Sequence, residues 1–151
     1  MPKILVIGVG SEYGSDDRVG LVVARRLKEL VPPGVELIEH TGDGTALVSA
    51  WNNTDLIFLI DATSSGAEPG TIYRIDGLST LLPAEISTSS THSFGLREAI
   101  KLARLLDQLP GSLLIFGIEG GSFSFGSKLS SEVEAAAESV VEQILNEIGI
   151  A

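Results

Sequence analysis

The sequence predicts an α/β protein, a three-layer α/β/α sandwich around a twisted, mostly parallel five-stranded sheet with one antiparallel strand. Short, uninterrupted apolar runs recur along the chain, as in strands buried on both faces of a parallel sheet. Stretches with apolar residues at helical spacing separate most of these runs. The chain has 151 residues, 44% of them apolar, which suits one domain and is too short for two of ordinary size. We therefore expect a single domain over residues 1–151.

Five strands are expected, each from one apolar run. They cover residues 4–7, 35–38, 56–60, 71–75 and 113–118. Asp61 directly follows the third strand. The connector between the third and fourth strands is too short for a crossover helix, so the fourth strand is predicted to run antiparallel at one side of the sheet.

Four helices are expected from apolar residues at spacings of three and four. They cover residues 19–30, 45–51, 96–106 and 131–148. Pro32-Pro33 ends the first helix and Pro110-Gly111 ends the third. The last helix opens with Ser131 and Glu134 at the spacing of a capping box. The residues expected to form its buried stripe are Val133, Ala137, Val140, Val141, Ile144 and Ile148.

Composition and charge argue against several classes of protein. Ten basic and twenty acidic side chains give a net charge of −10, which repels phosphate backbones and anionic membranes, so neither nucleic acid nor membrane is an expected partner. The absence of cysteine excludes thiolate nucleophiles, iron–sulfur clusters and cysteine zinc sites. No targeting peptide is recognisable and no apolar run approaches membrane-spanning length, so a cytoplasmic protein is expected.

Three groups that can ligate a metal are predicted to meet at one edge of the sheet. In an open α/β sheet, ligands bind beyond the carboxyl ends of the strands, where the strand order reverses. For a 2-1-3 order, that point lies between the first and third strands. Asp16 or Asp17 follows the first strand, Asp61 follows the third, and His92 precedes the third helix. Two carboxylates and one imidazole suit a divalent cation with open coordination positions.

Each of these residues also has a purely structural interpretation. The acidic pair stands at a helix start, where carboxylates interact favourably with the helix dipole. Asp61 fits an Asx-turn after its strand, and His92 fits an exposed position ahead of a helix. His40 has no comparable neighbours in the sequence and is expected to be structural.

Two binding modules of another class remain as alternatives. The loop from Gly8 to Gly14 (GVGSEYG) is close to a dinucleotide fingerprint, with Glu39 near the place of a ribose-binding acid. However, the loop has one residue too many between its second and third glycines, and Asp16 and Asp17 stand where a pyrophosphate would lie.

A phosphoacceptor receiver domain also has an acidic pair after its first strand and an Asp after its third, which hold Mg²⁺. Such a site needs a lysine soon after the fifth strand to hold the phosphoryl group. Here the fifth strand is followed by Glu119-Gly120-Gly121, and Lys128 is too far along the chain.

Several segments, taken in order and spacing, resemble the maturation endopeptidases of nickel–iron (NiFe) hydrogenases. The matching segments are IGVGS at residues 7–11, GSDDRVG at 14–20, IDA at 60–62, PGTI at 69–72, THSFGL at 91–96, and Gly117-Ile118 with Leu129-Ser130. One departure concerns the segment after the second strand, where many members have Asp-Gly-Gly-Thr. This chain reads Gly42-Asp43-Gly44-Thr45, so Asp43 stands one position later than the acid of those members.

The resemblance implies that Asp17, Asp61 and His92 are the metal-binding and catalytic residues of an aspartyl-type endopeptidase. The implied substrate is a hydrogenase large-subunit precursor that carries nickel, from which one C-terminal extension is removed. The nickel belongs to the substrate and marks it for recognition, and no organic cofactor is expected. Either the metal or a carboxylate would activate the attacking water.

Two further expectations concern the surroundings of the site. Residues 120–128, with Phe123 and Phe125 among glycines and serines, are either a wall of the groove for the extension or an ordinary loop. The enzyme is expected to work as a monomer, although the sequence does not decide its oligomeric state.

Overall fold

A computed structural model describes residues 2–41, 44–79, 96–123, 126 and 128–149. Its elements in chain order are β1 (Ile4–Val9), η1 (Asp16–Arg18), α1 (Val19–Lys28), β2 (Val35–His40), α2 (Gly44–Trp51), β3 (Leu56–Thr63), β4 (Ile72–Asp76), α3 (Leu96–Leu105), β5 (Ser112–Glu119) and α4 (Ser131–Ile148). Every strand and helix expected from the apolar pattern is present. The short 3₁₀ turn η1, which carries the acidic pair, was not predicted.

The strands form one sheet in the order β2-β1-β3-β5-β4. Neighbouring strands are parallel except for β4, which pairs antiparallel with β5 at the edge of the sheet. This arrangement confirms the predicted fold class and the antiparallel fourth strand. It also confirms the 2-1-3 order, because β1 lies between β2 and β3.

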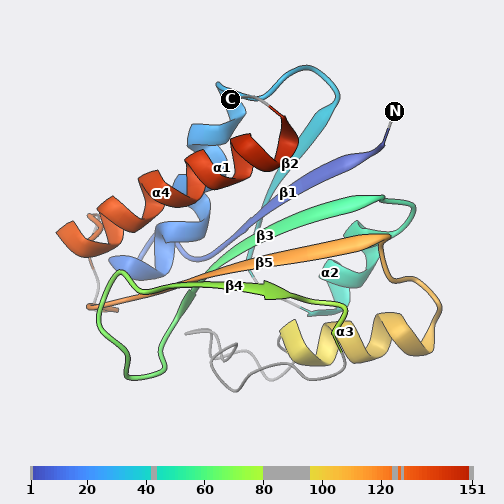
Figure 1. The fold of residues 1–151 in the computed structure, drawn as a ribbon. Coiled ribbons are helices and arrows are strands. Elements are labelled where there is room, and N and C mark those ends of the chain that lie inside the picture. Colours follow the sequence, from blue (N-terminus) through green and yellow to red (C-terminus); the bar gives the residue numbers. More distant parts are fainter. Residues whose placement is uncertain (1, 42–43, 80–95, 124–125, 127, 150–151) are drawn as a thin grey trace.

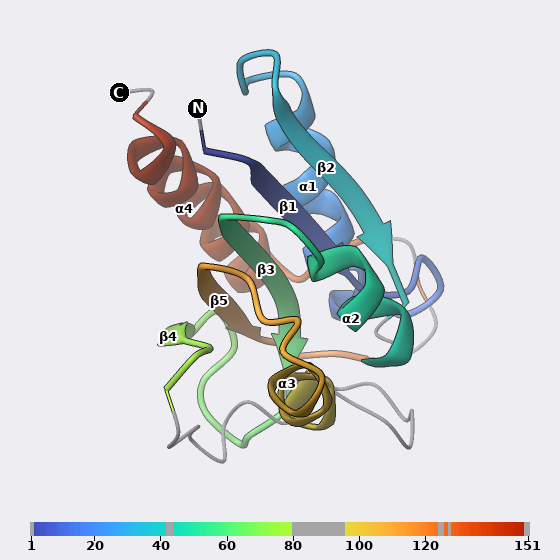
Figure 2. The ribbon, with the colours of Figure 1, turned by 90° about the vertical axis from the view of Figure 1, so that its right-hand side faces the viewer.

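The helices cover the two faces of the sheet in pairs, α1 with α4 on one face and α2 with α3 on the other (Figures 1 and 2). Alternate residues of each strand face opposite layers. In β1, Leu5 and Ile7 pack in the cluster of the α2–α3 face, whereas Val6 packs in the cluster of the α1–α4 face. The three layers are therefore held by two separate apolar cores.

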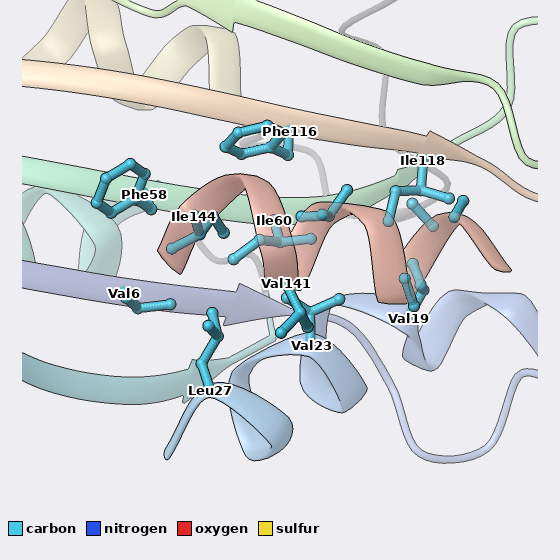
Figure 3. Packing of buried hydrophobic residues seen from close by; sticks show 14 of the residues in the cluster. Val6, Val19, Val23, Leu27, Phe58, Ile60, Phe116, Ile118, Val141 and Ile144 are labelled. Atoms are coloured by element: carbon cyan, nitrogen blue, oxygen red, sulfur yellow. The ribbon is translucent and has the colours of Figure 1, made fainter. Parts of the chain in front are cut away.

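The core under α1 and α4 holds in place the helix α1, which directly follows the turn carrying the acidic pair. Figure 3 shows Phe58 of β3 and Phe116 of β5 among the branched side chains of the two helices. The residues of α4 that are fully or nearly buried are Val133, Ala136, Ala137, Val140, Val141 and Ile144, with Ile148 partly buried beside them. The predicted stripe of α4 is thus confirmed.

The expected capping box at the start of α4 is wrong. The N-cap is Ser130, and it makes no side-chain hydrogen bond to the helix. The Ser130 hydroxyl instead donates to Asp16 (2.9 Å), and the Glu134 carboxylate accepts from Arg26 of α1 (2.7 Å). Long-range partners thus replace the local ones that the spacing suggested.

The third strand is longer than predicted. Its apolar run ends at Ile60, but β3 continues to Thr63 because Asp61, Ala62 and Thr63 pair with the last three residues of β5. Asp61 therefore lies inside a strand and does not begin a loop. Among the described residues, no helix combines the length and the apolar character needed to cross a bilayer.

Candidate active site at the carboxyl edge of the sheet

The turn after β1 brings the start of α1 against the ends of two strands. Gly20 makes this possible, because a Cβ there would lie 2.1 Å from the carbonyl oxygen of Val9 and 2.4 Å from that of Ile60. Gly8 faces the helix in the same way, since its Cβ would lie 2.3 Å from the Gly20 carbonyl oxygen. The two glycines let α1 approach the strands more closely than any other residue would allow. The acidic pair, just ahead of α1, is thereby placed at the switch point.

In the loop from Gly8 to Gly14, the space next to Gly10 is occupied by the protein's own backbone. A Cβ on Gly10 would lie 2.2 Å from the carbonyl oxygen of Asp17. The amide of Gly10 donates to the carbonyl of His40 (3.0 Å), and that of Ser11 donates to the carbonyl of Asp17 (3.3 Å). Two amides that a phosphate-binding loop would offer to a ligand therefore already have partners. This arrangement disfavours the dinucleotide-binding alternative.

The structure separates the roles of the two adjacent acids. The Asp16 side chain is fully buried and accepts hydrogen bonds from the amides of Gly121 (2.7 Å), Ser122 (2.8 Å) and Ser130 (2.8 Å). With the Ser130 hydroxyl, four donors surround one carboxylate. Asp17 is only partly buried, and its side chain lies next to Gly14. Of the two residues, Asp16 is buried and Asp17 is only partly buried.

Asp61 is a buried carboxyl group in the last part of β3, only 5% exposed. Its Oδ1 accepts the amide of the next residue, Ala62 (2.8 Å), so no Asx-turn is formed. Burial raises the pKa of Asp61 well above its usual value, and the negative charge of Asp17 raises this pKa further, while the Ala62 amide opposes both. The turn η1, which carries Asp17, lies in contact with β3, which carries Asp61. The structure therefore brings together two of the three predicted residues.

The third predicted residue, His92, lies outside the described residues, as do Asp43 and Phe125. Of the residues that are described, no three histidine, aspartate or glutamate side chains form a group that could hold a metal ion. The predicted triad depends on His92, so it remains a prediction. His40 ends β2, and its carbonyl accepts the Gly10 amide noted above.

A third buried carboxylate, Glu119, was not predicted as part of the site. It ends β5, is 2% exposed, and accepts hydrogen bonds from the hydroxyls of Thr63 (2.9 Å) and Ser65 (2.7 Å). The amides of Ser65 (2.9 Å) and Gly66 (3.2 Å) also donate to it. The sequence contained a signal, since Glu119 directly follows the apolar run of residues 113–118, as Asp61 follows that of residues 56–60. A carboxylate with these partners also occupies the end of β5, where a receiver domain needs a lysine nearby.

The comparisons with known proteins agree with one another. The family model described as hydrogenase maturation protease (HycI) matches residues 21–147. The hydrogenase 2 maturation protease of Escherichia coli is 29% identical over 148 residues, which cover 95% of this chain and 88% of that protein. The hydrogenase expression/formation protein HupD of Thiocapsa roseopersicina is 28% identical over 95% of this chain, which spans 66% of that relative's length.

Solved structures give the same picture. The hydrogenase maturating endopeptidase HybD from Escherichia coli superposes with a TM-score of 0.82 at 28% identity, covering 97% of this chain and 94% of that one. The NiFe hydrogenase maturation protease HycI from Thermococcus kodakarensis gives a TM-score of 0.70 at 30% identity, covering 96% and 91%. The chain belongs to the hydrogenase maturation protease family.

Proposed function

We propose that this protein is the endopeptidase that removes the C-terminal extension of a nickel-loaded NiFe hydrogenase large-subunit precursor. In this proposal, Asp17, Asp61 and His92 contact the nickel that the precursor carries. The observation that supports it most directly is the buried carboxyl of Asp61 on β3, next to the turn η1 that carries the partly buried Asp17, at the switch point of the sheet. The proposal includes a cytoplasmic monomer without an organic cofactor.

The position of α3 supports the inclusion of His92. By strand alternation, Asp61 follows Ile57 and Leu59, which pack in the cluster of the α2–α3 face. The first residue of α3 is Leu96, and His92 precedes it by four positions in the sequence. An imidazole brought to this face would complete a set of one nitrogen and two oxygen donors, which suits nickel with open positions.

The two carboxyl groups differ in ways that suit different tasks. Asp17 is partly exposed and suits contact with a cation carried by an incoming protein. The raised pKa of Asp61 brings this group closer to the pH at which a general base exchanges protons efficiently. Asp61 would then accept a proton from the water that attacks the scissile carbonyl, while the substrate's nickel polarises that carbonyl or the water.

The test is a processing assay on a purified precursor, with and without nickel, read by intact mass. We expect nickel-dependent loss of one C-terminal peptide. Asp17→Asn and His92→Ala should each lower the processing rate by about 100-fold or more, because a side chain that contacts the reacting centre is lost. Far-ultraviolet circular dichroism should show that both variants remain folded.

Asp107→Asn is the matched control for the carboxylate change. Asp107 is exposed in the turn between α3 and β5, and its φ of 55° suits asparagine as well as aspartate. This variant should process the precursor at the wild-type rate. Cleavage that is equally fast without nickel would refute nickel recognition, and absence of cleavage of every candidate precursor would refute the proposed activity.

A further inference from the structure

Two buried carboxylates, Asp16 and Glu119, hold the same short segment of chain. Glu119 is its first residue and binds the end of β3 through the hydroxyl of Thr63. The segment continues through Gly120 and Gly121 to Ser122, and the amides of the last two residues donate to Asp16. Residues 119–122 thus connect the strand that carries Asp61 with the turn that carries Asp17. We call residues 119–122 the brace.

Backbone hydrogen bonds reinforce both ends of the brace. The amide of Gly120 donates to the carbonyl of Thr63 (3.1 Å), two residues beyond Asp61. The amide of Asp16, the residue before Asp17, donates to the carbonyl of Ser122 (2.9 Å). Each neighbour is therefore joined to the brace by main chain and by a side-chain carboxylate. Groups held by several bonds to rigid backbone have little freedom to shift.

The backbone at the centre of the brace lies close to neighbouring side chains. A Cβ on Gly120 would lie 2.4 Å from Cζ of Phe123 and 3.1 Å from Cβ of Asp16. A Cβ on Gly121 would lie 3.0 Å from Cγ of Pro69. A larger residue at either position would therefore have to displace Phe123 or Pro69 next to the brace.

The proposed site places two carboxyl groups, Asp17 and Asp61, at the same edge of the sheet, where like charges repel each other. Without restraint, such groups relax by moving apart or by turning toward water. The hydrogen bonds of the brace oppose this movement on both sides. Asp16 and Glu119 are buried and fully engaged with donors of the protein, so neither is placed to contact a substrate.

We propose that the brace sets the separation of Asp17 and Asp61, with Asp16 and Glu119 as positioning residues. The inference rests on the proposed function of Asp17 and Asp61. It assigns to the first acid of the pair a role different from that of the second, and it gives Glu119 a role in the reaction without contact with the precursor. Precise placement of catalytic groups by surrounding hydrogen bonds is a general requirement for efficient turnover.

The test measures kcat and KM for precursor processing by Asp16→Asn and Glu119→Gln. Each change keeps the volume of the side chain but replaces an oxygen that accepts hydrogen bonds with an NH₂ group that can only donate them. We expect kcat to fall about 10- to 100-fold, with the KM for the precursor within about twofold of wild type. Assays are run at a temperature at which circular dichroism shows each variant fully folded.

A milder pair of variants is used if the buried side-chain amides of Asp16→Asn and Glu119→Gln prevent folding. Thr63→Val removes the hydroxyl that donates to Glu119 but keeps the shape of the side chain, whereas Thr63→Ser keeps the hydroxyl. We expect a lower kcat for Thr63→Val and recovery for Thr63→Ser. The matched control for Glu119→Gln is Glu68→Gln, at an exposed position of the β3–β4 loop, which should process at the wild-type rate.

The outcomes separate the brace from the proposed function. Wild-type kcat in folded Asp16→Asn and Glu119→Gln, with Asp17→Asn inactive, would overturn the brace and leave the proposed function standing. A rise in KM with unchanged kcat would also overturn it, because that pattern indicates lost substrate contact. Full processing by Asp17→Asn would instead overturn the proposed function on which the brace depends.

Discussion

Asp61→Asn is expected to abolish precursor processing while making the folded protein more stable at neutral pH. The amide keeps the oxygen that accepts the Ala62 amide hydrogen bond, so the local structure has no reason to change. It removes an acid whose charged form is disfavoured by burial and by the charge of Asp17, so that its pKa is raised. Loss of the carboxylate should lower the processing rate by about 100-fold or more. Processing is followed by intact mass and stability by thermal unfolding.

The stability difference should depend on pH in a defined direction. In the unfolded chain, an aspartate titrates near pH 4 (about 3.9). Because the folded pKa of Asp61 is raised, the folded protein keeps a proton that the unfolded chain has lost, and stability falls as the pH rises through this window. Asp61→Asn does not suffer this loss. The difference in Tm between variant and wild type should therefore be small near pH 4, grow with pH, and level off above the raised pKa.

Two results would contradict this expectation. Processing at the wild-type rate by Asp61→Asn would remove Asp61 from the site. A Tm below that of wild type at neutral pH would show that the carboxylate stabilises the fold, contrary to the effect of its burial. Asp107→Asn, the same chemical change at an exposed turn, should leave processing unchanged.

Gly20→Ala is expected to destabilise the protein strongly, although the same change stabilises most helices by about 1 kcal/mol. The new methyl group would meet two strand carbonyl oxygens, those of Val9 and Ile60, at less than van der Waals distance. Both contacts are backbone, so no side chain can turn away to relieve them. Overpacking of this kind costs about 3 kcal/mol, which lowers the Tm of a domain of this size by about 6–12 °C.

Thermal and urea unfolding of Gly20→Ala measure this effect, with Ser49→Ala as the control at an exposed position of α2. The control should change the free energy of unfolding by less than about 0.5 kcal/mol. Because α1 would have to move away from β1 and β3, Asp17 should move with it, and processing should slow even well below the Tm. An unchanged or higher Tm would show that α1 does not pack as closely as described.

The elements of this fold could be predicted because their signals are local. A run such as residues 56–60 is apolar throughout, which marks a strand buried on both faces. The stripe of α4 follows the helical period from Val133 to Ile144. The antiparallel fourth strand followed from the length of one connector. These patterns depend on residues that are neighbours in the chain, so the sequence alone was enough to predict the strands and helices.

The capping box shows where local reasoning failed. Ser131 and Glu134 have the required spacing, but the structure places Arg26 of α1 beside Glu134 and uses Ser130 as the N-cap. A charged partner competes effectively with a local amide for the same carboxylate. The pairing of Glu134 with Arg26 joins residues 108 positions apart, so no local sequence pattern predicts it.

For the candidate site, too, some features could be predicted from the sequence and others depend on residues distant in the chain. The sequence by itself predicted that Asp61 and an acid of the pair meet at the switch point for a 2-1-3 strand order, because each acid follows the end of an apolar run. Only the tertiary structure decided that Asp16 is the buried member of the pair and Asp17 the partly buried one. It alone also showed that Glu119 is engaged with the end of β3. The physical reason is that a carboxylate becomes structural when backbone donors surround it, and those of Asp16 come from residues more than 100 positions away.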